Sequence, residues 1–235
     1  MGPHFLDRLF APRAIAVFGA SERHDSVGGR VFGNLLQSDF SGQLYAVNPK
    51  HKHLFKQDCY PSIEAIGKSV DLAIIATPAA IVPDIIHACG EQSVGAAIIV
   101  SAGFSEGDGR GTALEKAVID MARRYQIRIL GPNCLGLIRT SINLNATFSK
   151  NTAKHGHLAL ISQSGALCTA VLDWAATYDI GFSAIASLGD AADVDFGDIL
   201  DYLAQDPETH SILLYVEGVR EARRFMIKVF GRFGR

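Results

Sequence analysis

The sequence has few of the residue patterns that build metal, redox or membrane sites. Its 235 residues include only four cysteines, Cys59, Cys89, Cys134 and Cys168, and no two of them form a Cys-x-x-Cys pair. The sequence therefore signals neither a zinc site nor a redox dithiol. No charged N-terminal segment leads into an apolar run, and no run approaches the ~18 apolar residues of a membrane span. These absences favour a protein of the reducing cytoplasm that has no metal of its own and no contact with a membrane.

Neither sign of charge predominates, since 22 Lys and Arg face 24 Asp and Glu and the net charge is −2. This balance does not favour a surface that follows the phosphates of a nucleic acid. The hydrophobic content of 48% is sufficient for a buried core. A chain of this length fits one large domain or two ordinary ones.

A repeated strand pattern fills the first 130 residues. Apolar runs alternate with helix-length segments, which predicts parallel strands covered on both faces. Each run ends in small, polar, turn-forming residues, and in a parallel sheet these ends lie along one edge, where ligands bind. The predicted strands are 14–18, 44–47, 72–76, 96–100 and 127–130, and the predicted helices lie near Gly29–Ser38, Val82–Gly90 and Thr112–Tyr125.

The polar stretch Thr140–Lys154 predicts a crossing into a second unit, which gives domains at residues 1–149 and 150–235. Three strands are predicted for the second unit, whereas typical sheets have about four to six. The second domain is therefore expected either to be cut short or to take strands from another chain. Its predicted strands are 158–161, 182–186 and 212–216, with helices from Gly165 to about Tyr178 and over Phe196–Ala204.

The loop after the first strand differs from the usual dinucleotide fingerprint. Gly19 fits the Gly-x-Gly-x-x-Gly pattern, but Ser21 stands at the second glycine, and Gly28-Gly29 comes too late. The backbone N–H groups of such a longer loop can still bind a diphosphate. A tight strand-to-helix turn without a ligand is the alternative.

The residues after the next strand favour an adenosine that carries an extra phosphate. An NAD site needs an acid there for the ribose hydroxyls, but this chain has Asn48-Pro49-Lys50. A lysine attracts a ribose phosphate, as in NADP or coenzyme A, although a surface lysine after a turn remains the alternative. The amide of Asn133 suits the peptide-like arm of coenzyme A, and Gly103 lets backbone approach a ligand.

Motifs spread along the chain carry a family resemblance. In their order they resemble the amino-terminal part of the NDP-forming acyl-CoA synthetases, relatives of the succinyl-CoA synthetase α subunit. The same two domains form the front half of Pat-type protein lysine acetyltransferases. The resemblance implies an α/β fold, with a Rossmann-like coenzyme A-binding domain followed by a flavodoxin-like domain that is truncated here. The motifs are Phe5-Leu6, Pro12–Ser21, Asn48-Pro49-Lys50, Gly131–Gly136, Ile161–Ala166 and Tyr215–Gly218.

The resemblance also implies ligands and site residues for the first domain. Its ligand would be coenzyme A or an acyl-CoA, while ADP or ATP and Mg would bind only the complete protein. All of the binding residues follow predicted strands, so the geometry of the fold agrees with the assignment. Together with Gly19 they are Ser21, Lys50, Thr77, Pro78, Ser101, Phe104 and Asn133.

In the second domain, Ser162, Ser164 and Gly165 precede or open a predicted helix, whose N-terminus stabilises an anion. In the family, the matching helix start holds the phosphate of a phosphohistidine. A plain N-cap serine is the alternative. Glu217 matches the family's glutamate that orients the catalytic histidine; a solvated acid at a strand end is the alternative.

The catalytic histidine is not expected in this chain, because the family places it beyond the next strand. The pair His155 and His157 favours a strand entry over catalysis or metal binding. The chain alone is therefore expected to be inactive. Its partner in the complete reaction would be a nucleotide-grasping domain or subunit, and an oligomer is possible.

Two other functions stay open at this point. The chain could be the acyl-CoA-sensing regulatory module of a lysine acetyltransferase, followed by an acetyltransferase domain. Gly165 and Glu217 favour the synthetase over that alternative. An NADP-dependent oxidoreductase is a remote alternative, because Lys50 suits the ribose phosphate of NADP as well as that of coenzyme A. The acyl group, the choice of ADP or GDP, and whether the chain is a natural product or a truncated one are not fixed by the sequence.

Overall fold

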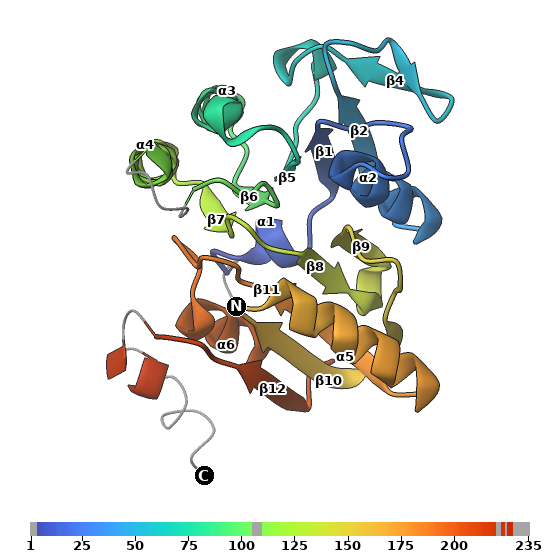
Figure 1. Cartoon of the computed structure of the whole chain (residues 1–235), viewed down its shortest axis with the longest axis vertical. Coiled ribbons are helices and arrows are strands. Elements are labelled where there is room, and N and C mark those ends of the chain that lie inside the picture. Colours follow the sequence, from blue (N-terminus) through green and yellow to red (C-terminus); the bar gives the residue numbers. More distant parts are fainter. Residues whose placement is uncertain (1–3, 105–109, 220–221, 224, 228–235) are drawn as a thin grey trace.

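The structure is a computed structural model that describes residues 4–104, 110–219, 222–223 and 225–227. Two sheets with their helices form two units, stacked one above the other in Figure 1. The α/β class predicted from the sequence is confirmed. Outside the described part lie residues 1–3 and 105–109 of the predicted first domain, and residues 220, 221, 224 and 228–235 of the predicted second domain.

The first sheet has the strand order β3-β4-β2-β1-β5-β6-β7. All of its neighbouring strands pair in parallel except β3 and β4, which are antiparallel. The five predicted strands are present, and the short polar strands β3 and β4 add to them. Without β3, the order is that of a dinucleotide-binding fold, with its switch point between β1 and β5. The strands are β1 (Ala14–Phe18), β2 (Gln43–Val47), β3 (His53–Leu54), β4 (Gln57–Tyr60), β5 (Leu72–Ile75), β6 (Ala96–Ile99) and β7 (Arg128–Leu130).

Helices cover both faces of the first sheet because its central strands are apolar on both sides. In β1, Ile15 and Val17 pack with the buried side chains of α2, whereas Ala16 and Phe18 pack in a second cluster with those of α3 and α4. The chain therefore leaves β1 toward one face and β5 toward the other, which opens a crevice at the switch point. The helices are α1 (Asp7–Phe10), α2 (Val27–Gln37), α3 (Val82–Glu91) and α4 (Arg110–Tyr125), with short 3₁₀ turns at Glu64–Ile66 and Ala79–Ile81.

The second sheet has five strands in the described residues, not the predicted three, in the order β12-β10-β11-β8-β9. The two additional strands pair antiparallel and come from residues before the predicted boundary at residue 149. The sequence pattern does not indicate these two strands, because they contain buried polar side chains, among them Arg139, Asn145 and Thr147. The strands are β8 (Gly136–Arg139), β9 (Leu144–Thr147), β10 (Lys154–Ser162), β11 (Gly181–Ser187) and β12 (Ser211–Tyr215), and a 3₁₀ turn at Thr140–Ile142 joins β8 to β9.

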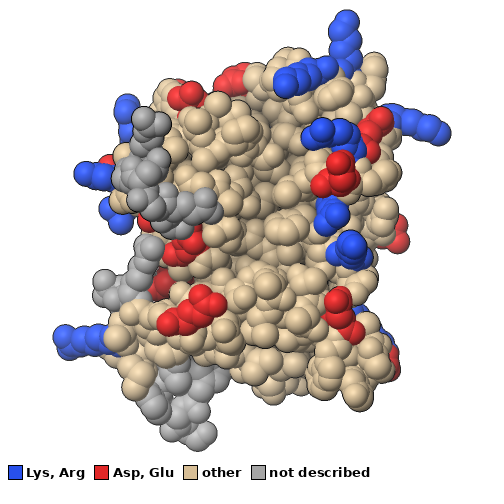
Figure 2. Space-filling model, viewed as in Figure 1, with Lys and Arg blue, Asp and Glu red and all other residues tan. Residues whose placement is uncertain are grey.

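One hydrophobic core joins the two units. Helices α5 (Gly165–Thr177) and α6 (Phe196–Leu203) pack on opposite faces of the second sheet, since their buried residues fall in different clusters. The cluster of α6 also contains Ile161 of β10 and Ile15 of β1, so it continues into the first sheet. Figure 2 shows acidic and basic side chains interspersed over one face of the molecule. No helix in the described part of the chain has the length and apolar character to span a membrane.

Candidate functional site

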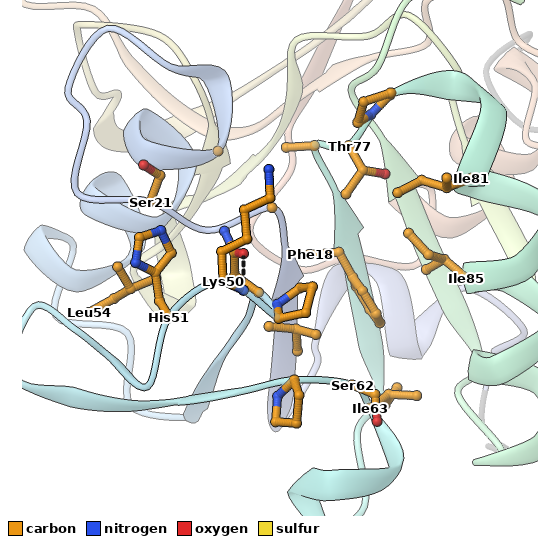
Figure 3. Close-up of a pocket in the computed structure, with 18 of the residues that line it drawn as sticks. Phe18, Ser21, Lys50, His51, Leu54, Ser62, Ile63, Thr77, Ile81 and Ile85 are labelled. Atoms are coloured by element: carbon orange, nitrogen blue, oxygen red, sulfur yellow. Dashed lines mark hydrogen bonds between the residues drawn. The ribbon is translucent and has the colours of Figure 1, made fainter.

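A cavity of about 1270 Å³ lies at the switch point of the first sheet. The loops after β1, β2 and β5 line it together with α3, as Figure 3 shows. Segments far apart in the sequence thus meet at one sheet edge. Five of the residues predicted to bind the cofactor line this cavity: Gly19, Ser21, Lys50, Thr77 and Pro78.

The turn after β1 requires glycine at two positions. Gly19 has φ +81°, and a Cβ there would lie 2.6 Å from the carbonyl oxygen of Ala76. A Cβ on Gly28 would lie 2.0 Å from the carbonyl oxygen of Gly19, so the start of α2 presses against the turn. Ser26 caps α2 by accepting from Gly29 N. Because the first N–H groups of a helix lack intrahelical acceptors, the end of α2 that lines the cavity favours an anion.

The loop after β2 supplies an exposed cation, Lys50, to this cavity. Asn48 fixes that loop, since its Oδ1 accepts from Lys50 N at 3.0 Å and its Nδ2 donates to the carbonyl oxygen of Ala20 at 2.9 Å. Figure 3 shows the Lys50 side chain extending between Ser21 and Thr77. A charged amine therefore faces the same cavity as the start of α2.

Thr77 presents a hydroxyl group without a partner. Its Oγ1 is buried and makes no hydrogen bond within the described structure. Its carbonyl oxygen accepts from Ser101 Oγ at 2.5 Å, so Ser101 holds the loop and does not line the cavity. Phe104 is fully buried in the core, and Asn133 lines a different cavity. The predicted cofactor contacts of these last three residues stay predictions.

A second cavity, of about 540 Å³, lies between the two units. It is lined by Ser164, Gly165 and Glu217 of the second unit and by Asn133 of the first, which the sequence assigned to the coenzyme A loops. Ser162 is fully buried and does not line the cavity; its Oγ accepts from Ser164 N at 3.0 Å. Ser164 is the N-cap of α5 and accepts from Leu167 N at 3.3 Å. As at any helix start, the first N–H groups of α5 have no intrahelical acceptors, and the Ser164 cap satisfies that of Leu167.

A backbone seam, formed by residues 129–133 and 190–194, sets the walls of the second cavity. The N–H groups of Asp190, Ala192 and Val194 donate to the carbonyl oxygens of residues 132, 131 and 129, each at 3.0 Å. The sequence does not indicate this seam, because a run of polar and acidic residues after a strand is typical of a solvated loop.

An ion-pair cluster lies at one end of the seam. Arg128 donates to Asp193 at 2.9 Å and to the fully buried Asp198 at 2.8 Å. Burial alone would lower the pKa of Arg128, but its hydrogen bonds and ion pairs with the two aspartates raise that pKa above the ordinary value. The guanidinium therefore joins β7 of the first sheet to the loop and helix of the second unit.

The cysteines near the second cavity are not nucleophiles at neutral pH. Burial raises the pKa of Cys134 to about 12 and that of Cys168 to about 11. Because only a thiolate attacks or binds metal, the two thiols act there as small apolar groups.

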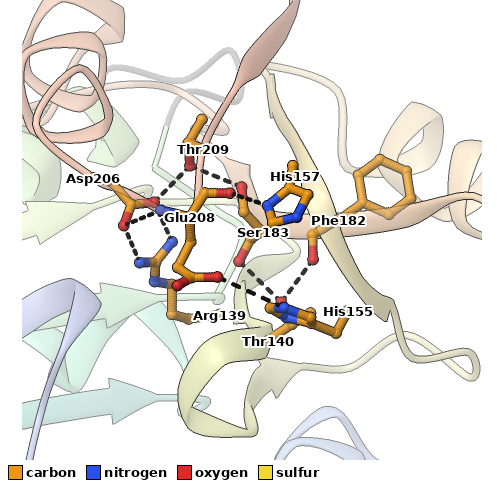
Figure 4. A network of polar contacts seen from close by, with 9 residues as sticks. All are labelled: Arg139, Thr140, His155, His157, Phe182, Ser183, Asp206, Glu208 and Thr209. Atoms are coloured by element: carbon orange, nitrogen blue, oxygen red, sulfur yellow. Dashed lines mark hydrogen bonds and ion pairs between the residues drawn. The ribbon is translucent and has the colours of Figure 1, made fainter.

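The histidine pair lies in a structural network at the entry of β10 (Figure 4). His155 lies 3.1 Å from Thr140 Oγ1 and 3.6 Å from a carboxylate oxygen of Glu208. His157 hydrogen-bonds the carbonyl oxygen of Glu208 at 3.0 Å and stacks on His210. Among the described residues, no group of three or more His, Cys, Asp and Glu could hold a metal ion.

Two protein families match the chain, one for each unit. Residues 13–140 match the CoA binding domain, and residues 155–229 match the succinyl-CoA ligase like flavodoxin domain. The gap between the two matches contains β9, and β8 falls at the end of the first match. The matches therefore support two units of different type.

Curated relatives cover almost the whole chain. An ADP-forming acetate–CoA ligase I of Archaeoglobus fulgidus is 46% identical over 94% of this chain and 32% of its own length. The α subunit of an ADP-forming acetate–CoA ligase I of Pyrococcus furiosus is 40% identical over 94% of this chain and 49% of its own length. The chain thus spans from a third to a half of the length of these relatives.

Solved structures agree in fold. A protein of Pyrococcus horikoshii OT3 is 42% identical with a TM-score of 0.92, over 95% of this chain and 51% of its own. A dinucleotide-forming acetyl-coenzyme A synthetase 1 of Ca. Korarchaeum cryptofilum, solved with phosphate and ADP, is 38% identical with a TM-score of 0.91, over 95% of this chain and 48% of its own.

Proposed function

The chain belongs to the NDP-forming acyl-CoA synthetases, as their α-subunit-like part, and from this premise we propose that its first cavity binds coenzyme A or an acyl-CoA. One observation carries the proposal: loops from three strands gather Gly19, Lys50 and Thr77 around a cavity at the start of a helix. The chain's own residues supply a helix start, a cation and an unpartnered hydroxyl group around this cavity.

The chemistry of coenzyme A fits this cavity part by part. The diphosphate would lie at the start of α2, where N–H groups and the helix dipole favour negative charge. The 3′-phosphate of the adenosine would lie at Lys50, which binds phosphate as a point charge. The unpartnered hydroxyl of Thr77 gives a polar ligand atom a partner that the protein itself does not provide.

In the second cavity we propose that phosphate binds at the start of α5 and that Glu217 orients a histidine supplied from outside residues 1–235. A phosphate oxygen bonds to the thioester carbonyl carbon while the C–S bond breaks, which gives an acyl phosphate and the thiolate of coenzyme A. The phosphoryl group then passes to the histidine, releasing the acid, and from the histidine to ADP, forming ATP. The relative solved with phosphate and ADP supports an anion in this reaction.

The partner in this proposal is a nucleotide-grasping domain or subunit that binds ADP. The relatives named above are ligases, which supports a synthetase over the regulatory half of an acetyltransferase. One of them is a separate α subunit, which supports a partner on another chain.

Calorimetric titration of this chain with coenzyme A, dephospho-coenzyme A and NADPH tests the proposal. We expect Lys50→Ala to weaken coenzyme A binding by about 1–3 kcal/mol, the range of a charge-assisted hydrogen bond, and dephospho-coenzyme A binding much less. Lys52→Ala is the matched control, because Lys52 is exposed nearby but does not line the cavity. Equal losses for both coenzymes would remove Lys50 from the 3′-phosphate site. Binding of NADPH alone would overturn the proposed function.

A further inference from the structure

Glu217 lines the second cavity, but no contact with another described residue holds its side chain in place. It is exposed after the end of β12, and its carboxylate makes no hydrogen bond or ion pair with other described residues. A group that orients a catalytic partner needs a fixed position, because small displacements reduce catalysis strongly. The position of Glu217 must therefore be set through its backbone.

The backbone at Glu217 is held by one side-chain oxygen. Gln163 Oε1 accepts from Glu217 N at 2.7 Å and from Gly218 N at 3.0 Å. Both partners are N–H donors, so the amide oxygen of Gln163, and not its nitrogen, must face them. A single amide thus links the loop after β10 to the loop after β12.

Gln163 is itself well fixed. Its N–H donates to the carbonyl oxygen of Tyr215 at 3.3 Å, which extends the parallel pairing of β10 with β12 by one residue. On either side of it, Ser162 Oγ and Ser164 N are hydrogen-bonded at 3.0 Å. The anchor therefore rests on the sheet and on the turn that starts α5.

The NH₂ group of the Gln163 side chain is available to a ligand in the cavity. Gln163 lines the cavity beside Ser164 and Gly165, and within the described residues its Nε2 has no hydrogen-bond partner. Two amide hydrogens thus lie near the first N–H groups of α5, where the proposed function places a phosphate.

We infer that Gln163 is a positioning residue: its oxygen fixes Glu217 at the cavity, and its NH₂ group donates to the anion bound at the start of α5. This inference rests on the proposed function for the role of Glu217 and of the anion. The link between Gln163 and the backbone of residues 217–218 can be tested separately.

Two substitutions separate the two halves of the amide. Gln163→Met removes both the acceptor and the donors at similar length, whereas Gln163→Glu keeps an acceptor and removes the donors. Gln205→Met is the matched control, because Gln205 is exposed and does not line the cavity.

The first measurement is amide hydrogen exchange of Glu217 and Gly218 by NMR. We expect exchange to accelerate about tenfold in Gln163→Met, the order of one lost hydrogen bond, and to stay near the wild-type rate in Gln163→Glu and Gln205→Met. Unchanged exchange in Gln163→Met would overturn the anchoring role.

The second measurement is titration with inorganic phosphate, followed through the amide shifts of Gly165 and Ala166. We expect both Gln163 variants to bind phosphate more weakly than the wild type. The loss should be larger in Gln163→Glu, about tenfold or greater, because a negative charge replaces two hydrogen-bond donors. Equal affinity in wild type and Gln163→Glu would overturn the donor role. Coenzyme A binding should be unchanged in both variants. If the wild type itself does not bind coenzyme A, the proposed function is refuted, but the result of the hydrogen-exchange measurement still stands.

Discussion

The two cavities differ in the number of units that form them. The first is enclosed by loops and a helix of one sheet, and the side chain that fixes its second loop, Asn48, hydrogen-bonds a residue of the same unit. The second is lined by both units, and its walls depend on the seam of residues 129–133 with 190–194. The proposed cofactor site thus depends on one unit, whereas the proposed anion site depends on the contact between two.

The different origins of the cavities suggest different sensitivities. A change within the seam should disturb the second cavity and leave the first intact. A change in the loop after β5 should affect the first cavity alone. The following substitutions are given in order of decreasing effect, and those at Arg128 and Thr77 test this division.

Arg128→Met should have the largest effect, because it removes the cation that joins the two units. It leaves the fully buried carboxylate of Asp198 without its guanidinium partner. Breaking a buried pair from one side costs about 3–5 kcal/mol of unfolding free energy. Urea denaturation measures this loss, and Arg123→Met, on the exposed part of α4, should change it by less than about 0.5 kcal/mol.

The milder variant Arg128→Lys tests the division between cavities. It retains a charge but loses the planar fork that contacts both aspartates. We expect phosphate affinity in the second cavity to fall and coenzyme A affinity in the first to stay unchanged. A parallel loss of both affinities would show that the first cavity also depends on the contact between the units.

Five strands of the first sheet could be predicted because their signal is local, whereas the short polar strands β3 and β4 have no such signal. The runs 14–18 and 72–75 are buried on both faces and hence continuously apolar. Strands β8 and β9 gave no such signal, because Arg139 is buried by an ion pair with Asp206, 67 residues away. No local pattern in the sequence indicates that a distant carboxylate will neutralise this arginine.

The same contrast holds for the sites. Gly19, Lys50 and Thr77 could be predicted as neighbours, because the carboxyl ends of parallel strands share an edge. The fixed position of Glu217 could not, because it depends on the side chain of Gln163, 54 residues earlier in the chain. Asn133 was assigned by its place after a strand, but the seam turns that loop toward the second cavity.

Asp206→Asn should have the second-largest effect, and the effect should depend on pH. Asp206 pairs with Arg139 at 2.6 Å, and both side chains are less than a tenth exposed. Burial alone would raise the pKa of the Asp206 carboxyl, but hydrogen bonds from Arg139 and Thr209 lower it below the ordinary value. We expect a loss of about 2–3 kcal/mol at pH 7, the range of hydrogen bonds to charged groups.

The sign of the pH dependence follows from this lowered pKa. The carboxylate stabilises the fold fully above its unfolded-state pKa of about 3.9, and the stabilisation is lost as the pH falls through the lower folded-state pKa. Urea denaturation from pH 7 to pH 3 should therefore show a smaller acid loss in Asp206→Asn than in the wild type. Asp58→Asn, which removes an exposed pair with His53 in the first sheet, is the control and should change the stability at pH 7 by less than about 0.5 kcal/mol.

Thr77→Val should have the smallest effect on stability, and the effect should have the opposite sign. Its Oγ1 is buried without a partner in the described structure, so replacing the hydroxyl by a methyl group removes an unsatisfied polar atom. We expect the free energy of unfolding without ligand to rise by about 0.5–1 kcal/mol, and coenzyme A affinity to fall by about fivefold if that hydroxyl bonds the ligand. Thr152→Val, at an exposed position outside the first cavity, should change neither quantity. A destabilised Thr77→Val variant would mean that the hydroxyl already has a partner in the free protein, and the first cavity would then lose one of the groups that distinguish it as a ligand site.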